Sequence, residues 1–354
     1  MSDKKWLLYG ANGYTGKLIT ELALARGHKP VLAGRSEARL RPLAEASGLE
    51  MRIFDLSNAE AVAEQLADVA LVMHAAGPYL HTAAPMVEAC LQSSTHYLDI
   101  TGEAPVMEAN FALDSRAREA NVLLLSGTGF DVVPSDCLAC YVAEKIDTPA
   151  ELSIAFCSTA GSPSPGTMKT MLSYVHKGVF ARRNGKYVPV SPADLQQRIH
   201  FPDRERTVLP ITWGDLATAY RSTGIANITT FTAYPGKSAR MLPALRFILR
   251  FAPARKLALR WVEKNITGPD EKTRATARSY FYAHVKNAKG EQAEAWLETP
   301  EGYRLTAETA VRCVERVLAG HYTGAATPAQ LFGADFILDV PEVRRLDAIT
   351  KISE

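Results

Sequence analysis

A glycine-rich turn near the start of the chain has the spacing of a phosphate-binding loop. It reads YGANGYTG, with glycines at positions 10, 13 and 16, and it lies between an apolar stretch and a helical pattern. The first glycine permits a tight turn, the second lets the backbone approach a pyrophosphate, and the third lets a helix pack on a strand. A purely structural turn is the alternative. The expected pyrophosphate site comprises Gly10, Asn12, Gly13, Tyr14, Thr15 and Gly16.

The end of the second expected strand indicates which cofactor binds. An Asp or Glu at this position usually binds the ribose of NAD, but the chain reads Ala33-Gly34-Arg35-Ser36 here. The Arg35 guanidinium can pair with a 2′-phosphate, and Ser36 can donate to the same phosphate while it begins the next helix. An exposed arginine ahead of a helix is the alternative. We therefore predict NADP(H), with NAD(H) less favoured.

Two further strand ends complete the expected cofactor site. Asp55 follows the third strand, where it can meet the adenine amine or serve as a carboxylate at a helix start. The fourth strand ends in small residues that would let the chain pass under the ribose and nicotinamide. These residues are Ala75, Ala76, Gly77 and Pro78.

Acidic and hydroxyl side chains near the same strand ends are candidates for proton transfer. Asp131, in the segment GTGFDVVPSD after the sixth strand, is the first choice for an acid that faces the substrate. Tyr79 and His81, just past the fourth strand, are the second choice, and Asp99 and Glu103 flank the end of the fifth. Each of these side chains can also be structural; Asp131, for example, can cap the following helix.

Two other motifs favour packing over chemistry. Tyr141 and Lys145 have the Tyr-x-x-x-Lys spacing of short-chain dehydrogenases, but a strand intervenes where that family has only helix, and such a match arises by chance about half the time. Cys137 and Cys140 lack a second ligand pair, and the histidines show no metal spacing. We expect no metal.

The elements that position these residues alternate in type over the first 130 residues. Short apolar runs separated by helical patterns are typical of buried parallel strands. We expect an α/β domain with a Rossmann-type doubly wound parallel sheet. The expected strands are Lys5–Tyr9, Pro30–Ala33, Met51–Phe54, Val69–Ala75, His96–Ile100 and Val122–Leu125, and the expected helices are Leu18–Arg26, Arg39–Ala46, Ala59–Ala67, Met86–Gln92 and Val106–Glu119. Ser57 to Glu60 fits a capping box at the third helix.

The pattern changes near residue 150 and indicates a second domain of α+β type. Asn227–Ala233 resembles a strand, and Asn287 to Gly290 predicts a hairpin between two others. We predict a Rossmann domain over residues 1–148, an α+β substrate or dimerisation domain over 149–320, and a C-terminal segment, 321–354, that returns to the first domain.

A long basic amphipathic helix is expected over Met241–Lys264, with Pro253 breaking or kinking it. The favoured interpretation is a domain helix with one apolar face against the sheet. The less favoured alternatives are contact with an anionic membrane surface and cover for a long acyl chain.

Composition narrows the class of protein. The chain has 354 residues and a net charge of +2. This charge is too small to indicate general nucleic-acid binding. The apolar stretch near the N-terminus is too short for a signal peptide, and the longest charge-free run, Val69–Val87, contains histidines and prolines that argue against a membrane span. Five cysteines without a secretion signal favour the cytoplasm.

Together these segments resemble the saccharopine dehydrogenase-like oxidoreductase family, in particular its bacterial branch with trans-acting enoyl reductases. The similarity rests on YGANGYTG, AGRS, HAAGPY, HYLDITGE and GTGFDVVPSD, and on TPEGYRLT near residue 300. The resemblance implies a Rossmann domain, an α+β substrate domain and NADP-linked reduction. Saccharopine reductases carry Gly-x-Asp-Pro-Gly after the sixth strand, and the valines that follow Asp131 depart from that pattern, so the resemblance implies a reductase class without a substrate.

We therefore expect an NADP(H)-dependent oxidoreductase that transfers hydride to or from a small molecule with a C=N, C=O or enoyl group. A noncatalytic NADP-sensing or scaffold protein is one alternative, and a lipid-associated reductase is another. A homodimer is compatible with the expected second domain.

Overall fold

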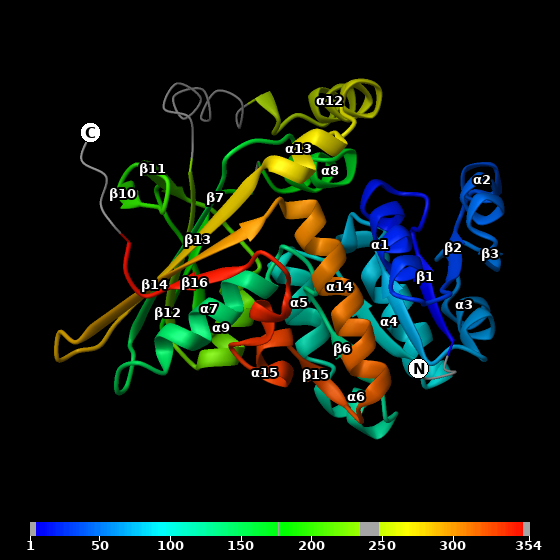
Figure 1. Ribbon diagram of the computed structural model, residues 1–354, viewed down its shortest axis with the longest axis horizontal. Helices are drawn as coiled ribbons and strands as arrows, with labels where there is room; N and C mark the ends of the chain where they lie inside the picture. The colour runs from blue at the N-terminus through cyan, green and yellow to red at the C-terminus, as the bar shows by residue number, and fades with distance from the viewer. Residues whose placement is uncertain (1–4, 176, 234–247, 350–354) are drawn as a thin grey trace. The chain divides into compact units, whose positions relative to one another are not determined.

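The chain divides into two compact units. The computed structural model (Figure 1) describes residues 5–175, 177–233 and 248–349. The first unit contains Met1–Val133 and Tyr303–Leu331, and the second contains Pro134–Gly302 and Phe332–Glu354.

These bounds differ from the predicted domain ranges at two helices. Helix α7 (Val133–Ala143) groups with the second unit, where Asp136 accepts a hydrogen bond from Ser222. Helix α14 (Gly302–Ala319) groups almost entirely with the first unit, because Glu315 on it pairs with Arg26 at 2.7 Å.

A parallel sheet of seven strands forms the centre of the first unit. Its order is β15-β6-β5-β4-β1-β2-β3, so the chain reverses direction across the sheet between β1 and β4. Leu7, Leu8, Leu32 and Leu71 on the central strands are fully buried, as expected for a sheet covered on both faces. The strands are β1 (Trp6–Tyr9), β2 (Val31–Gly34), β3 (Met51–Ile53), β4 (Leu71–His74), β5 (His96–Asp99), β6 (Leu123–Leu125) and β15 (Gly324–Ala326).

Helices connect these strands, and the predicted order of elements is confirmed. They are α1 (Tyr14–Ala25), α2 (Glu37–Ser47), α3 (Ala59–Leu66), α4 (Tyr79–Ser93), α5 (Ala104–Phe111), α6 (Asp114–Glu119), most of α14, and α15 (Pro328–Phe332). The single helix expected over Val106–Glu119 is wrong, since the chain breaks at residues 112 and 113 to give α5 and α6. The capping box is displaced by one residue, because Asn58 is the N-cap of α3 and accepts from the backbone N–H groups of Glu60 and Ala61.

A mixed sheet forms the second unit. Its main path is β10-β11-β12-β7-β13-β14-β16, with β8 paired to β12 and to β9. Among the described strands of this second sheet, only the β12–β7 pair is parallel. The strands are β7 (Glu151–Ser158), β8 (Phe180–Arg183), β9 (Lys186–Pro189), β10 (Gln197–His200), β11 (Glu205–Pro210), β12 (Asn227–Ala233), β13 (Arg278–Lys286), β14 (Gln292–Pro300) and β16 (Arg344–Leu346).

The hairpin predicted for this second unit is confirmed, whereas the C-terminal segment only partly returns to the first unit. The predicted hairpin joins β13 to β14, where the Asn287 side chain accepts from the N–H groups of Lys289 and Glu291. The C-terminal segment divides, because β15 pairs with β6 in the first unit while β16 pairs with β14 in the second. The helices are α7, α8 (Pro165–Tyr174), α9 (Asp215–Thr223), α12 (Ala252–Asn265), α13 (Glu271–Thr276) and the short 3-10 helix Phe336–Asp339.

The basic helix expected over Met241–Lys264 is described only in part. Residues 241–247 lie outside the described residues, and α12 begins at Ala252, so that Pro253 occupies the first turn. Proline is tolerated there because its missing N–H would have no partner within the helix. Within residues 5–175, 177–233 and 248–349, no helix has the length and apolar character needed to cross a membrane.

Candidate cofactor and substrate site

The glycine-rich turn after β1 leaves no room for side chains. Gly10 has a positive φ of 86°, and a Cβ there would lie 2.8 Å from the Cβ of Ala76 and 2.9 Å from the backbone carbon of Ala75. A Cβ at Gly16 would lie 2.3 Å from the Gly10 carbonyl oxygen. The turn from β1 into α1 and the end of β4 therefore approach through bare backbone, which is the arrangement that admits a pyrophosphate.

The start of α1 is open to an anion. Gly13 is the N-cap, no side chain caps the helix, and its first turn contains no acidic residue. The backbone N–H groups and the dipole at such a helix start favour negative charge. Half-buried Thr15 lies in this first turn, and the Tyr14 ring packs edge to face on Tyr303 at 4.9 Å.

Asn12 connects this turn to the end of β2. Its Oδ1 lies 3.2 Å from the position that a Cβ on Gly34 would occupy. Gly10 N–H also donates to the Ala33 carbonyl at 2.8 Å. The pyrophosphate turn and the AGRS segment are therefore neighbours, as the sequence-based site requires.

Polar groups gather at the ends of β2 and β3. Arg35 is exposed, and no described carboxylate forms an ion pair with it. Ser36 is the N-cap of α2, but its side chain makes no capping hydrogen bond, so the hydroxyl is not committed to that helix. Burial raises the pKa of Tyr9 to about 12, while the charge of Arg35 lowers this pKa and the charge of Asp55 raises it. Arg35 and Asp55 are therefore both close enough to Tyr9, at the end of β1, for their charges to change its pKa.

Asp55 lies in an exposed turn ahead of α3. Its carboxylate accepts from the Ser57 backbone N–H at 2.9 Å and from the Ser57 hydroxyl at 2.5 Å. These hydrogen bonds hold the pKa of Asp55 below its ordinary value. Contact with an adenine amine stays a prediction for this side chain.

The segment Ala75–Pro78 leads from β4 into α4. Ala75, Ala76 and Pro78 are half-buried and Gly77 is exposed. The Thr82 hydroxyl donates to the Ala76 carbonyl at 2.8 Å, which fixes the turn against the helix. These small residues stay the predicted floor for ribose and nicotinamide.

Tyr79 is built into the protein at the start of α4. Its hydroxyl donates to the His74 carbonyl at 3.1 Å, and its backbone N–H donates to Glu103 at 2.8 Å. Burial, with the charges of Asp99 and Glu103, raises the pKa of Tyr79 well above 10. These contacts favour a structural role, and they make Asp131 the better candidate for proton transfer. His81 is exposed on the same helix.

Asp131 occupies the loop that follows β6. Its carboxyl lies against the bare backbone of Gly102, where a Cβ would come within 2.3 Å of Oδ2. Although Asp131 keeps part of its surface accessible, desolvation of the carboxyl raises its pKa to about 7. A carboxyl that titrates near neutral pH can serve as a general acid or base.

A buried carboxylate holds this loop in place. Asp99, at the end of β5, accepts from the Gly127 N–H at 2.8 Å and from the Ser126 hydroxyl at 3.3 Å, and its carbonyl accepts from the Thr128 N–H at 2.7 Å. Burial raises the pKa of Asp99 to about 6, although these hydrogen bonds act in the opposite direction. Asp99 therefore positions the loop, which is a more specific role than flanking a strand end.

Sequence reasoning missed two residues of α14 that border the site. Thr306 accepts from the Phe130 N–H at 3.0 Å through its hydroxyl, and its methyl lies 2.8 Å from where a Cβ on Gly129 would be. Tyr303 packs on Tyr14 at the phosphate turn. Both residues belong to the segment TPEGYRLT, which in the sequence serves only as support for the family resemblance. Nothing in its residue types predicts contact with positions more than 170 residues earlier.

The two motifs for which we expected packing both lie in the second unit, where Cys137 is buried and its thiol donates to the Gly333 carbonyl at 3.8 Å. The Tyr141 hydroxyl donates to Asp347 at 2.8 Å, Lys145 pairs with the same carboxylate at 2.5 Å, and the Arg345 guanidinium lies 3.5 Å from the Tyr141 ring centre. Among the described residues no group of three His, Cys, Asp or Glu side chains could hold a metal ion.

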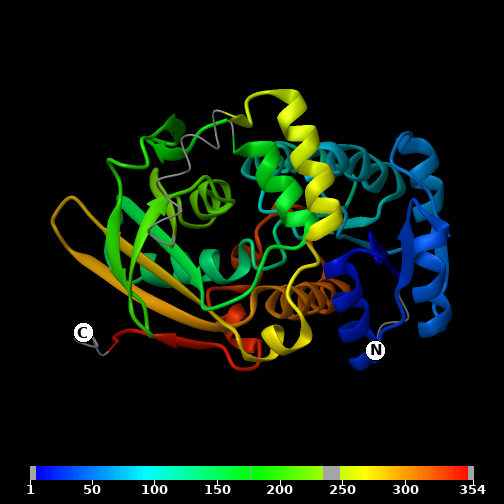
Figure 2. The same cartoon turned by 90° about the horizontal axis from the view of Figure 1, so that it is seen from above.

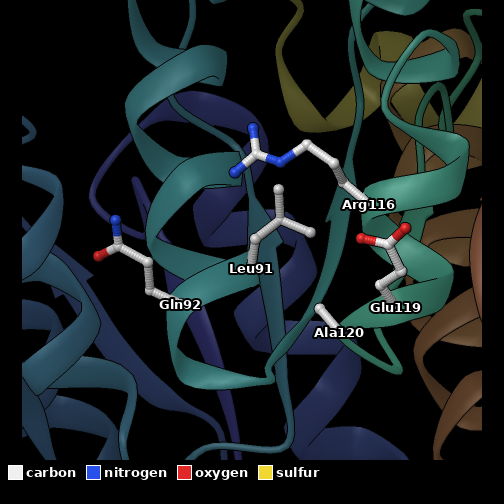
Figure 3. A pocket seen from close by; sticks show the side chains of 5 residues that line it. All are labelled: Leu91, Gln92, Arg116, Glu119 and Ala120. Carbon is white, nitrogen blue, oxygen red and sulfur yellow. The ribbon is translucent and has the colours of Figure 1, made fainter.

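Figure 3 shows a hollow in the first unit. It is lined by Leu91, Gln92, Arg116, Glu119 and Ala120. These residues lie near the C-terminal ends of α4 and α6, whereas the glycine turn and the Asp131 loop follow the carboxyl ends of strands. In parallel α/β sheets ligands bind at the carboxyl ends, so the hollow is not the predicted site.

Comparisons with known proteins agree with the geometry. Residues 6–125 match the family model described as the saccharopine dehydrogenase NADP binding domain. A Mycobacterium tuberculosis protein that carries the name trans-acting enoyl reductase is 35% identical over 179 residues, or 47% of this chain and 43% of that protein. A rat saccharopine dehydrogenase-like oxidoreductase is 26% identical over 223 residues, or 54% of this chain and 52% of that protein.

The chain therefore spans about half the length of the curated relatives it matches. A solved structure of saccharopine dehydrogenase (L-Glu forming) from Saccharomyces cerevisiae covers 97% of the chain with a TM-score of 0.66 at 14% identity, which shows a shared fold. The predicted resemblance and the predicted fold class are confirmed.

Proposed function

We propose that this chain is a reductase of the saccharopine dehydrogenase-like family and that it uses NADP(H). The observation that carries the proposal is the bare-backbone turn between β1 and α1, where added Cβ atoms at Gly10 and Gly16 would collide with backbone. The uncapped start of α1 supplies N–H groups for the pyrophosphate. The turn also lies between the ends of β2 and β4, where the two halves of a dinucleotide would extend.

The polar residues at the end of β2 would select the phosphorylated adenosine. Arg35 is exposed and has no ion pair with the described carboxylates, and the Ser36 hydroxyl is not used as a cap. A guanidinium can bind a phosphate through two parallel hydrogen bonds. This supports NADP(H) over NAD(H), with Asp55 available on the neighbouring strand.

The nicotinamide would lie over Ala75–Pro78 and deliver or accept a hydride when the cofactor is bound. The protein's contribution is a proton source beside it. Asp131 follows β6, and its pKa of about 7 keeps a protonated fraction available at neutral pH. Asp99 and Thr306 hold the loop on which Asp131 lies.

The substrate class that fits this chemistry is a small molecule with a polarised double bond. One curated relative is named for enoyl reduction and another only for a saccharopine dehydrogenase-like activity, so C=N, C=O and conjugated C=C bonds all belong in the test.

The experiment separates cofactor binding from turnover. NADPH and NADH binding would be titrated by calorimetry, and NADPH oxidation would then be followed with imines, ketones and enoyl thioesters. We expect tighter binding of NADPH and turnover of one substrate class, with Asp131→Asn reducing turnover at least a hundredfold while the NADPH affinity stays within threefold. Binding of NADPH without turnover of any substrate class would favour an NADP-sensing protein instead.

A further inference from the structure

Helix α12 exposes an unusual amount of apolar side chain. Leu257 is 70% exposed and Trp261 is 57% exposed, and these two residues lie one turn apart on the same face of the helix. Ile248 and Phe251, just ahead of the helix, are 54% and 56% exposed. Single exposed apolar residues are ordinary, but several in one short segment mark a surface that contacts another phase or molecule.

The opposite face of α12 accounts for its packing. Val262 is buried, Leu259 is half-buried, and the helix packs against α8, as Figure 2 shows. The exposed face is therefore not needed to attach α12 to its own unit. On α8, Met171 is also exposed.

Basic side chains border the apolar stripe. Lys256, Arg260 and Lys264 are all exposed and repeat every four residues, so they form a second stripe beside Leu257 and Trp261. None of the three forms an ion pair with another described residue. The exposed side of α12 thus combines a tryptophan and a leucine with a row of cations that have no ion-pair partner within the described part of the chain.

We propose that this face of α12 docks on an anionic lipid bilayer. Leucine and tryptophan would enter the boundary between headgroups and acyl chains, while the lysines and the arginine would contact lipid phosphates. Charge decides against a second copy of the chain as the occupant. A symmetric contact would place the same patch against itself and oppose its cations to one another. The proposal is independent of the bound cofactor, so its failure would leave the proposed reductase function unaffected.

The test is flotation of the full chain with vesicles of phosphatidylcholine alone and of phosphatidylcholine with phosphatidylglycerol. Binding is expected only to the anionic vesicles at 50 mM salt, and at least fivefold weaker at 500 mM salt because the lipid charge is then screened. Trp6 and Trp296 are buried, and the half-buried Trp213 packs on Phe156, so a blue shift and quenching by brominated lipid would report chiefly on Trp261 in the bilayer. Equal binding to both kinds of vesicle, or binding to neither at low salt, would overturn the proposal.

Variants distinguish vesicle binding through this face of α12 from nonspecific binding by other exposed residues. Leu257→Asp with Trp261→Asp, and Lys256→Glu with Arg260→Glu, are each expected to weaken vesicle binding at least tenfold. The matched controls are Val188→Asp, at an exposed apolar position on β9, and Lys289→Glu, in the hairpin turn after β13; both should bind like the parent chain.

Two further outcomes would contradict the proposal. In one, vesicle binding is unchanged in both α12 variants although circular dichroism shows them folded. In the other, sedimentation shows a dimer that the Leu257 and Trp261 changes dissociate, with no binding to vesicles.

Discussion

Gly10→Ala tests the phosphate turn through the geometry of the backbone. A side chain at Gly10 must adopt the left-handed φ of 86°, which costs about 1–2 kcal/mol, and its Cβ would meet Ala75 and Ala76 within 3 Å. Overpacking of this kind costs about 1–3 kcal/mol more. We therefore expect the free energy of unfolding of the first unit to fall by about 2–5 kcal/mol. The turn must also shift, so NADPH affinity should fall at least tenfold.

Gly48→Ala is the matched control for this change. Gly48 also has a positive φ, of 66°, but a Cβ there would meet nothing within 4 Å. Only the conformational cost of about 1–2 kcal/mol applies, and NADPH affinity should stay within twofold. The assays are thermal unfolding followed by fluorescence and calorimetric titration at a temperature where all three proteins are folded. Equal destabilisation by both changes, or unchanged NADPH affinity in Gly10→Ala, would refute the close approach of this turn to the end of β4.

Three other changes have defined outcomes. Arg35→Ala should weaken NADPH binding at least tenfold and leave NADH binding within threefold, by calorimetry; a parallel loss for both nucleotides would contradict selection by this guanidinium. The raised pKa of Asp131 means that the folded state holds a proton that the unfolded chain releases between pH 4 and 7, so this carboxyl lowers stability as the pH rises through that window. The stability of Asp131→Asn relative to the parent chain should therefore be greater at pH 8 than at pH 5 in urea unfolding, and a constant difference would argue against a desolvated carboxyl. Asn58→Ala should reduce stability by about 1 kcal/mol, since it removes the cap of α3, whereas Ser57→Ala should have a smaller effect; the reverse order would restore the capping box first expected.

Local chemistry explains why much of the first unit could be predicted. Fully buried strands produce uninterrupted apolar runs, and the glycine at position 27 ends α1 as its lack of a Cβ allows. The glycine turn and the AGRS segment are adjacent in the structure because the carboxyl ends of neighbouring parallel strands share one edge of the sheet.

Long-range pairing explains what could not be predicted. Helix α14, from beyond residue 300, packs in the first unit, where Thr306 contacts Phe130 and Glu315 pairs with Arg26. No local sequence pattern predicts these contacts. Asp99 is a carboxylic acid at the end of a strand, so the sequence alone makes it a candidate for catalysis. Its hydrogen bonds to the loop after β6 identify it instead as a positioning residue. The break between α5 and α6 could not be predicted either, because apolar residues continue across it.

The most direct test of the proposed function is a calorimetric titration of the purified chain with NADPH and, separately, NADH. We expect NADPH to bind with one site per chain and at least tenfold more tightly than NADH, with an increase in thermal stability at saturation. Absence of heat and of any thermal shift with either nucleotide would contradict the assignment of the turn between β1 and α1 to a dinucleotide.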